Sequence, residues 1–141
     1  MNTMKHLVVV GFAVVLAAGF VGCLHQGSSH VKLQGRWSGT EAGRTEKITL
    51  TFSGNRFAYT DNQSREIGSG TFIVNRTKQP MEMDLTFEII PSPEHVGKVG
   101  LAIFELQGNE LKIAGCEPGS GRRPQSIVAG QGVRVFTFNR E

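Results

Sequence analysis

Apolar and polar residues alternate with a period of two through most of residues 33–140. The clearest case is 81–89, where every odd position from Met81 to Ile89 is apolar and every even position is Glu, Asp or Thr. This period is typical of strands that bury one face, so the odd side chains are expected to point to one side together. No sustained apolar period of 3.6 residues occurs between 31 and 141, so the pattern predicts at most one turn of helix.

About eight strands are expected at short, regular spacing, over residues 36–40, 48–52, 57–59, 70–74, 81–89, 99–106, 110–113 and 133–138. The links between them are short: residues 53–55 indicate a three-residue hairpin loop, and 107–109 a tight turn. Short links favour antiparallel, up-and-down pairing, and closing the sheet removes exposed edges. The fold class predicted is therefore an all-β, eight-stranded antiparallel barrel. Side chains can fill the interior of such a barrel, or a small ligand can occupy it.

A basic and then apolar leader precedes these strands. Lys5 is followed by an uncharged stretch of 15 residues, Leu7 to Val21. This pattern is typical of a secretory signal peptide and is shorter than a membrane-spanning helix requires. The predicted organisation is a signal peptide over 1–22, a polar tether over 23–32 and a single domain over 33–141.

The leader ends in Val21-Gly22-Cys23, which resembles the lipobox of bacterial lipoproteins. The resemblance implies that Cys23 is lipidated, with chains such as palmitate, and becomes the new N-terminus. The membrane would then be a partner through this lipid anchor, because several acyl chains suffice for stable anchoring. The expected location is the cell envelope, facing the periplasm or the cell surface, and Leu24 favours the outer membrane by analogy with other lipoproteins. A plain secretory signal with an incidental Cys23 is the alternative.

The charge balance argues against a nucleic-acid partner. The formal net charge is +3 and the pI is about 9.1, but the leader contributes one Lys and no acid. Without residues 1–22 the chain has 14 bases and 12 acids among 119 residues, a net charge of +2. A nucleic-acid binder needs a basic face that displaces counterions, so the basic pI carries little information about partners.

Motifs of catalysis, metal binding and cofactor binding are missing from the sequence. It contains no Gly-x-Ser-x-Gly, no P-loop and no paired histidines in a predicted element, so neither a cofactor nor a metal is expected. If Cys23 is acylated, Cys116 has no partner for an internal disulfide, and its apolar surroundings predict a buried structural thiol. The pair Glu94 and His95 lies in the loop 91–96, after two prolines, and is expected at a solvated loop tip. The sequence therefore favours a protein that is not an enzyme.

The motif Gly35-Arg36-Trp37 on the first strand, with Arg140 near the end of the last, is similar to the signature of the lipocalin (calycin) superfamily. The resemblance implies that Arg140 packs over Trp37 and closes one end of the barrel. Further segments in the same order extend the likeness: 33–37, 50–57, 70–72, 78–87, 100–111 and 116–124. Together they resemble a lipocalin-like bacterial domain of uncharacterised function, common in planctomycete-type proteins, which implies a fold and a compartment but no reaction.

Three further residues are candidate contacts for a ligand or partner. Asp84 is either a polar anchor inside the barrel or half of an outward ion pair. Arg122 and Arg123 lie in a Gly- and Pro-rich connection, where they either bind an anion at the rim or fix the loop through its own carbonyl groups. In both cases the second interpretation is favoured.

Three hypotheses of function follow. The first is a lipid-anchored module that binds a small apolar or amphipathic ligand in the barrel, which requires a cavity of at least a few hundred Å³. The second is a protein-interaction or structural envelope domain with a filled barrel, its protein partner unknown. The third, ranked last, is a hydrolase that uses Cys116 or Glu94 and His95.

Overall fold

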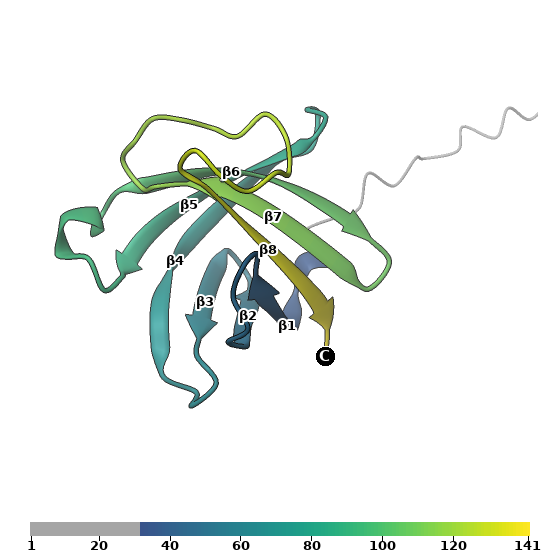
Figure 1. Ribbon diagram of the computed structural model, residues 1–141, viewed down its shortest axis with the longest axis vertical. Helices are drawn as coiled ribbons and strands as arrows, with labels where there is room; N and C mark the ends of the chain where they lie inside the picture. Colours follow the sequence, from purple (N-terminus) through teal and green to yellow (C-terminus); the bar gives the residue numbers. More distant parts are fainter. Residues whose placement is uncertain (1–31) are drawn as a thin grey trace, which may run out of the picture.

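The computed structural model describes residues 32–141; the predicted signal peptide, Cys23 and the rest of the tether lie outside this part of the chain. Eight antiparallel strands form one closed barrel in which each strand pairs with its neighbours in sequence and β8 pairs with β1 (Figure 1). The strands are β1 (Gly35–Glu41), β2 (Ile48–Ser53), β3 (Arg56–Thr60), β4 (Glu66–Asn75), β5 (Met81–Ile89), β6 (Val99–Gln107), β7 (Glu110–Cys116) and β8 (Val133–Arg140). The predicted fold class is confirmed, and the closed barrel is consistent with a lipocalin-like fold.

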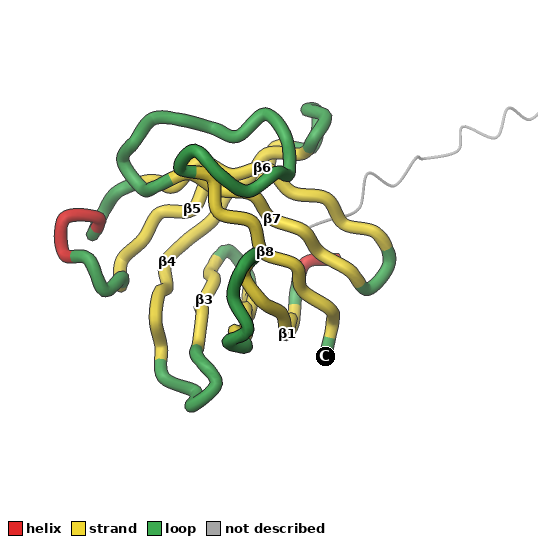
Figure 2. Tube along the Cα trace, viewed as in Figure 1, coloured by secondary structure: helices red, strands yellow, loops and turns green. Residues whose placement is uncertain are grey.

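The β2–β3 connection is short, as the sequence pattern predicts, but its length differs from the prediction. Ser53 pairs with Arg56, so the β2–β3 loop has two residues and not the three expected. Gly54 has φ +61°, a backbone conformation that glycine adopts without steric cost. The helical content in the β5–β6 loop is one 3-10 turn, η1 (Pro93–His95) (Figure 2).

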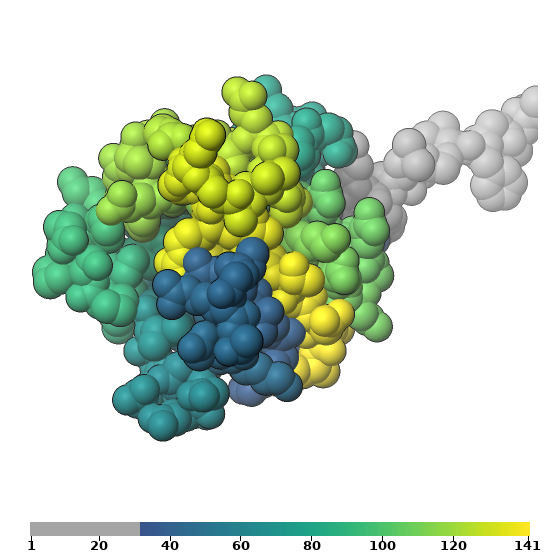
Figure 3. All heavy atoms as spheres, viewed as in Figure 1, coloured from purple at the N-terminus to yellow at the C-terminus, as the bar shows by residue number. Residues whose placement is uncertain are grey.

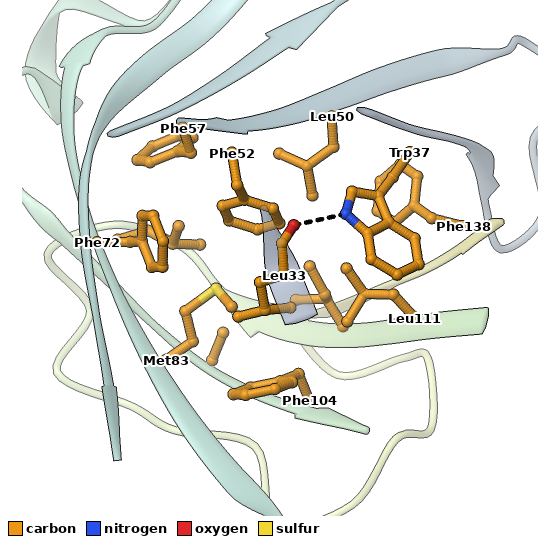
Figure 4. Packing of buried hydrophobic residues seen from close by; sticks show 13 residues of the cluster. Leu33, Trp37, Leu50, Phe52, Phe57, Phe72, Met83, Phe104, Leu111 and Phe138 are labelled. Atoms are coloured by element: carbon orange, nitrogen blue, oxygen red, sulfur yellow. Dashed lines mark hydrogen bonds between the residues drawn. The ribbon is translucent and has the colours of Figure 1, made fainter. Parts of the chain in front are cut away.

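One half of the barrel interior is packed solid. Trp37 is fully buried, and its indole nitrogen Nε1 donates a hydrogen bond of 2.8 Å to the carbonyl oxygen of Leu33, which lies across this end of the barrel (Figure 4). Inward side chains from seven further strands surround it, among them Leu50, Phe52, Phe57, Phe72, Met83, Phe104, Leu111 and Phe138. Packing of this kind supplies most of the favourable free energy of folding.

Two glycines let neighbouring strands come unusually close. A Cβ atom on Gly39 would lie 1.9 Å from the carbonyl oxygen of Thr137, and one on Gly70 would lie 1.8 Å from that of Thr86. Gly70 also lies at a shift in the register between β4 and β5. These contacts leave no room for any side chain, so both positions require glycine.

A second, smaller apolar cluster lies outside the barrel. Ile103, Ala114 and Val135 face away from the interior, and residues 117–132 cover them, with Ile127 packed against the cluster. In the space-filling view this connection, coloured yellow-green, covers the upper part of the face shown (Figure 3). Strands β6 to β8 therefore bury apolar side chains on the outer face as well, at Ile103, Ala114 and Val135.

The alternating pattern predicts that Ile89 points the same way as the other odd residues of 81–89, and this prediction is wrong. Ile89 ends the alternating segment of β5, but its side chain is 52% exposed. Ile89 pairs with Ser69 at the point where the β4–β5 register shifts, and a shift of one residue turns the following side chains to the other face.

Candidate functional site

The other half of the barrel interior is hollow and forms the candidate site. A cavity of about 820 Å³ lies at the end of the barrel where the loops β5–β6 and β7–β8 emerge, and it is partly open to solvent. Its wall includes six inward apolar or aromatic side chains: Ile48, Tyr59, Leu85, Phe87, Ile113 and Phe136. This volume lies within the usual range for small-molecule sites.

Small residues explain why this half is not filled. Gly100 on β6 and Gly115 on β7 line the cavity at positions where the other half of the barrel carries Phe104 and Leu111. A Cβ atom on Gly115 would meet only the Cβ of Ala102, at 3.7 Å, so space is left in front of it. At Gly100 the ring of Phe87 lies 3.2 Å from the position of a Cβ and partly fills the gap.

Aromatic rings form one wall of the cavity. The rings of Tyr59 and Phe136 lie with their centroids 6.1 Å apart, and Phe136 stacks on Phe138 at 6.0 Å with an interplanar angle of 8°. Phe87 meets Phe57 edge to face at 5.1 Å. These contacts fix the rings to the filled core below, so the wall is preorganised for an apolar ligand.

An ion pair lies at the rim above this wall. The guanidinium of Arg134 donates two hydrogen bonds of 2.7 Å to the two carboxylate oxygens of Glu41, and its carbon Cζ lies 5.2 Å from the ring centroid of Phe136. The side chain of Glu41 is only 9% exposed, against 61% for Arg134. The hydrogen bonds from Arg134 lower the pKa of Glu41 and those same bonds raise the pKa of Arg134, so both groups stay charged at neutral pH.

A second polar pair borders the cavity at the β5–β6 and β7–β8 loops. His95, in the β5–β6 loop, places Nε2 2.8 Å from Oε1 of Glu117, which begins the β7–β8 loop. Both residues line the cavity. The predicted solvated tip at His95 is wrong: its side chain is only 16% exposed because the contact holds it against the neighbouring loop.

Tyr59 brings a neutral polar group to the aromatic wall. Burial raises the pKa of its phenol, while the nearby charge of Arg134 opposes that effect, so the hydroxyl is protonated at neutral pH. Within residues 32–141, no hydrogen bond to this hydroxyl is found. A ligand in the cavity would meet a donor without a partner in the protein.

The structure brings Trp37 and Arg140 together at the opposite, filled end of the barrel. The Cζ carbon of Arg140 lies 4.1 Å from the Trp37 ring centroid, and its Nη1 donates 2.8 Å to the carbonyl oxygen of Gln34. Its Nη2 is bonded to the carbonyl oxygen of Lys32. This geometry closes the end of the barrel and has no contact with the cavity.

Arg123 and Asp84 also lie together, on the outer face of the barrel. Nη2 of Arg123 lies 2.7 Å from Oδ1 of Asp84, and its Nη1 donates 2.8 Å to the carbonyl oxygen of Ala102. Arg122 contacts the carbonyl oxygen of Gln131 in its own loop at 3.3 Å. Arg123 therefore ties the connection 117–132 to β5 and β6, away from the cavity.

The hydrolase hypothesis rests on Cys116 or on Glu94 and His95. Cys116 is a buried free thiol, and no hydrogen bond within residues 32–141 joins it to His95, although both border the cavity. The described part of the chain contains no group of three or more His, Cys, Asp or Glu side chains suited to a metal. No helix in residues 32–141 is long and apolar enough to cross a membrane.

Glu41, Tyr59 and Arg134 are the site residues that sequence reasoning missed. Alternation offered a signal for Tyr59, which shares its face with Phe57, and for Arg134, which shares its face with Phe136 and Phe138. Glu41 and Arg134 are 93 positions apart, and only the β1–β8 pairing that closes the barrel brings them together.

In comparisons with known proteins, no family model, no curated protein and no solved structure matches this chain. What the structure establishes is therefore the closed eight-stranded barrel and its half-hollow interior.

Proposed function

We propose that this protein binds a small apolar or amphipathic molecule in the cavity at the open end of its barrel. The observation that carries the proposal is the cavity of about 820 Å³ with its aromatic and aliphatic wall, in a barrel whose other half is tightly packed. Burying apolar ligand surface contributes about 25 cal/mol per Å², so a ligand of modest size gains useful affinity from the wall alone. A binding role with no catalytic step accounts for the site.

The test uses N-phenyl-1-naphthylamine, a neutral probe whose fluorescence rises in apolar surroundings, added to the full chain. The wild-type protein is expected to raise the emission in a saturable manner. Gly115→Phe places a ring in the cavity, since nothing but the Cβ of Ala102 lies near that position. It is expected to weaken probe binding by at least about tenfold, equivalent to about 1.4 kcal/mol.

The matched control is Ala58→Val, which adds bulk on β3 between the inward residues Phe57 and Tyr59 and therefore on the outer face. Circular dichroism establishes that both variants fold. Absence of probe binding to the folded wild-type protein, or equal binding by the two variants, would favour the alternative function, an interaction or structural domain that takes no ligand.

We further propose that the domain is held at a bacterial envelope membrane by acylated Cys23. The support is the sequence of the leader, with the lipobox-like segment 20–23 followed by a polar tether. Mass spectrometry of the protein purified from its own membrane is expected to show a mature chain that begins at Cys23 with added acyl mass. A mature chain without acyl mass would leave the plain secretory signal as the explanation, and the same spectrum would reveal any retained ligand.

A further inference from the structure

Two arginines share one carboxylate at the rim of the cavity. Arg134 donates through Nε and Nη2 to the two oxygens of Glu41, each at 2.7 Å, and Nε of Arg44 lies 3.1 Å from Oε2 of the same group. Within residues 32–141, neither arginine forms a salt bridge with a second acid. Arginine stays charged at any physiological pH, so two positive charges and one negative charge leave this part of the rim with a surplus of +1.

Part of the Arg134 guanidinium remains open to a ligand. Its Nη1 makes no hydrogen bond within the described part of the chain, because Glu41 takes only Nε and Nη2. The side chain lines the cavity and is 61% exposed. An anion that meets the guanidinium here stays partly hydrated, so the pair forms without the desolvation cost of a fully buried ion pair. Guanidinium N–H groups also form strong, charge-assisted hydrogen bonds with carboxylates.

Tyr59 supplies a second donor on the same wall. Its ring centroid lies 6.1 Å from that of Phe136, and Cζ of Arg134 lies 5.2 Å from the same centroid, so both polar groups border one aromatic ring. The phenol is protonated at neutral pH, and its hydroxyl has no partner within residues 32–141. A carboxylate accepts hydrogen bonds at both oxygens, so it can satisfy an N–H of Arg134 and the O–H of Tyr59 together.

The acid in the cavity lining belongs to the other polar pair. Oε1 of Glu117 lies 2.8 Å from Nε2 of His95, where the β5–β6 and β7–β8 loops meet. The side chain of Glu117 is 67% exposed, so water and salt screen its repulsion of a bound anion. The surplus positive charge at Arg134, by contrast, lies directly over the aromatic wall.

We propose that the cavity binds single-chain amphipathic anions, with the carboxylate head at Arg134 and Tyr59 and the apolar chain along the aromatic wall. This inference rests on the proposed function, since it names the head group of the ligand for the same cavity. The head remains at the open end in contact with water, whereas the chain is buried. The wall therefore supplies most of the affinity, and the rim decides between charges.

The experiment measures displacement of N-phenyl-1-naphthylamine from the full chain by decanoate and by decylammonium, at neutral pH and low salt. The two competitors have the same chain and opposite charge. Wild-type protein is expected to bind decanoate about tenfold more tightly, and this advantage should shrink in about 1 M salt, which screens exposed charges. Equal binding of the two competitors at low salt, or tighter binding of decylammonium, would overturn the inference.

Two variants that differ only at residue 134 test the contact itself, with 1-decanol as the neutral reference for the chain. Glu41→Gln removes the counter-charge of Arg134 and is expected to raise the ratio of decanoate to 1-decanol affinity by about fivefold or more. Adding Arg134→Met should abolish that gain, and no buried carboxylate is left without its partner. If the ratio is the same in both folded variants, Arg134 does not hold the head group.

Arg36→Met is the matched control for the loss of one positive charge. Arg36 lies beside Trp37 at the filled end and pairs with Glu141, with both side chains exposed. The variant is expected to leave the ratio unchanged. A loss as large as the one caused by Arg134→Met would mean that net charge, and not the rim, favours the anion, and would overturn the inference.

The outcomes separate the two proposals. If the probe binds and Gly115→Phe weakens its binding, but decanoate has no advantage over decylammonium, only the inference about the head group fails. If the wild-type protein does not bind the probe, the proposed function itself fails. Should the variants at residue 41 not fold, the comparison of the two charged competitors on the wild-type protein still decides the inference.

Discussion

Two arginines on β8 face into the barrel, one toward each end, and each lies over an aromatic ring. Arg140 covers Trp37 at the filled end, and Arg134 covers Phe136 at the open end. They differ in their partners: Arg140 donates to backbone carbonyl groups, whereas Arg134 donates to the carboxylate of Glu41. The first therefore closes the filled end of the barrel, and the second lies at the rim of the cavity.

Arg140→Met is expected to lower the free energy of unfolding by about 1–3 kcal/mol, because a cation–π contact and two hydrogen bonds to carbonyl groups are lost while the packing of the stem is kept. Urea denaturation monitored by the fluorescence of Trp37 measures it. Arg36→Met, which removes only an exposed ion pair with Glu141, should change stability by less than about 0.5 kcal/mol. Equal losses in the two variants would contradict a special role for Arg140.

The stability contributed by Glu41 is expected to depend on pH. Because its pKa is lowered below 4.5 in the folded state, this contribution is present above pH 4.5 and is lost as the pH falls through the folded value. The difference in unfolding free energy between wild type and Glu41→Gln should therefore be largest near neutral pH and shrink in acid. A difference that stays constant across this window would show that the ion pair does not stabilise the fold.

At the scale of elements, glycines have two distinct uses in these strands. Gly39 and Gly70 allow close approach of neighbouring backbones, whereas Gly100 and Gly115 leave room inside the barrel. The sequence shows all four simply as glycines within strand patterns, where they suggest bulges or close contacts. Their separate roles depend on which atoms stand opposite them.

Gly70→Ala is expected to be strongly destabilising, by more than about 2 kcal/mol, because its Cβ would lie 1.8 Å from the carbonyl oxygen of Thr86. Gly115→Ala should be neutral or slightly stabilising, since its Cβ finds ordinary contact distance and alanine loses less backbone entropy on folding. Thermal unfolding of the two variants side by side measures the contrast. Similar midpoints would contradict the close approach at Gly70.

The connection 117–132 behaves as a cover for the outer face of β6 to β8, and Arg123 fastens it to β5 and β6. Arg123→Ala should speed proteolytic cleavage within 117–132 and lower stability by about 1–2 kcal/mol, because the carbonyl group of Ala102 and the half-exposed carboxylate of Asp84 lose their donor. Limited proteolysis measures the first effect. Arg122→Ala is the control, expected to change cleavage little, and equal cleavage rates in both variants would argue against fastening by Arg123.

At the scale of the whole molecule, the barrel has a solid half that stabilises it and a hollow half that is available for binding. The solid half contains Trp37, the only tryptophan of the chain, and the hollow half ends in the rim of Glu41 and Arg134. The two halves share the same eight strands, so ligand binding should stabilise the whole fold without altering the surroundings of Trp37.

Saturating 1-decanol, at about one hundred times its dissociation constant, is expected to raise the unfolding free energy by about 2.7 kcal/mol. The emission maximum of Trp37 should stay unchanged, because this side chain is fully buried in the other half. Differential scanning fluorimetry and emission spectra measure the two effects. A shift of the emission maximum without stabilisation would indicate binding at the filled end or a rearranged barrel.

The sequence by itself determined the eight strands and their antiparallel order, because alternation, short links and turn glycines act locally along the chain. It also favoured closure of the barrel, because an open sheet would expose its edges. It also indicated Trp37 and Arg140 as partners, through resemblance to a known signature. Only the tertiary structure decided which interior positions stay hollow, because a glycine facing the interior and a glycine at a close strand contact look the same in sequence. The Glu41–Arg134 pair was decided in the same way, since the last strand must meet the first before residues so distant in sequence can form an ion pair.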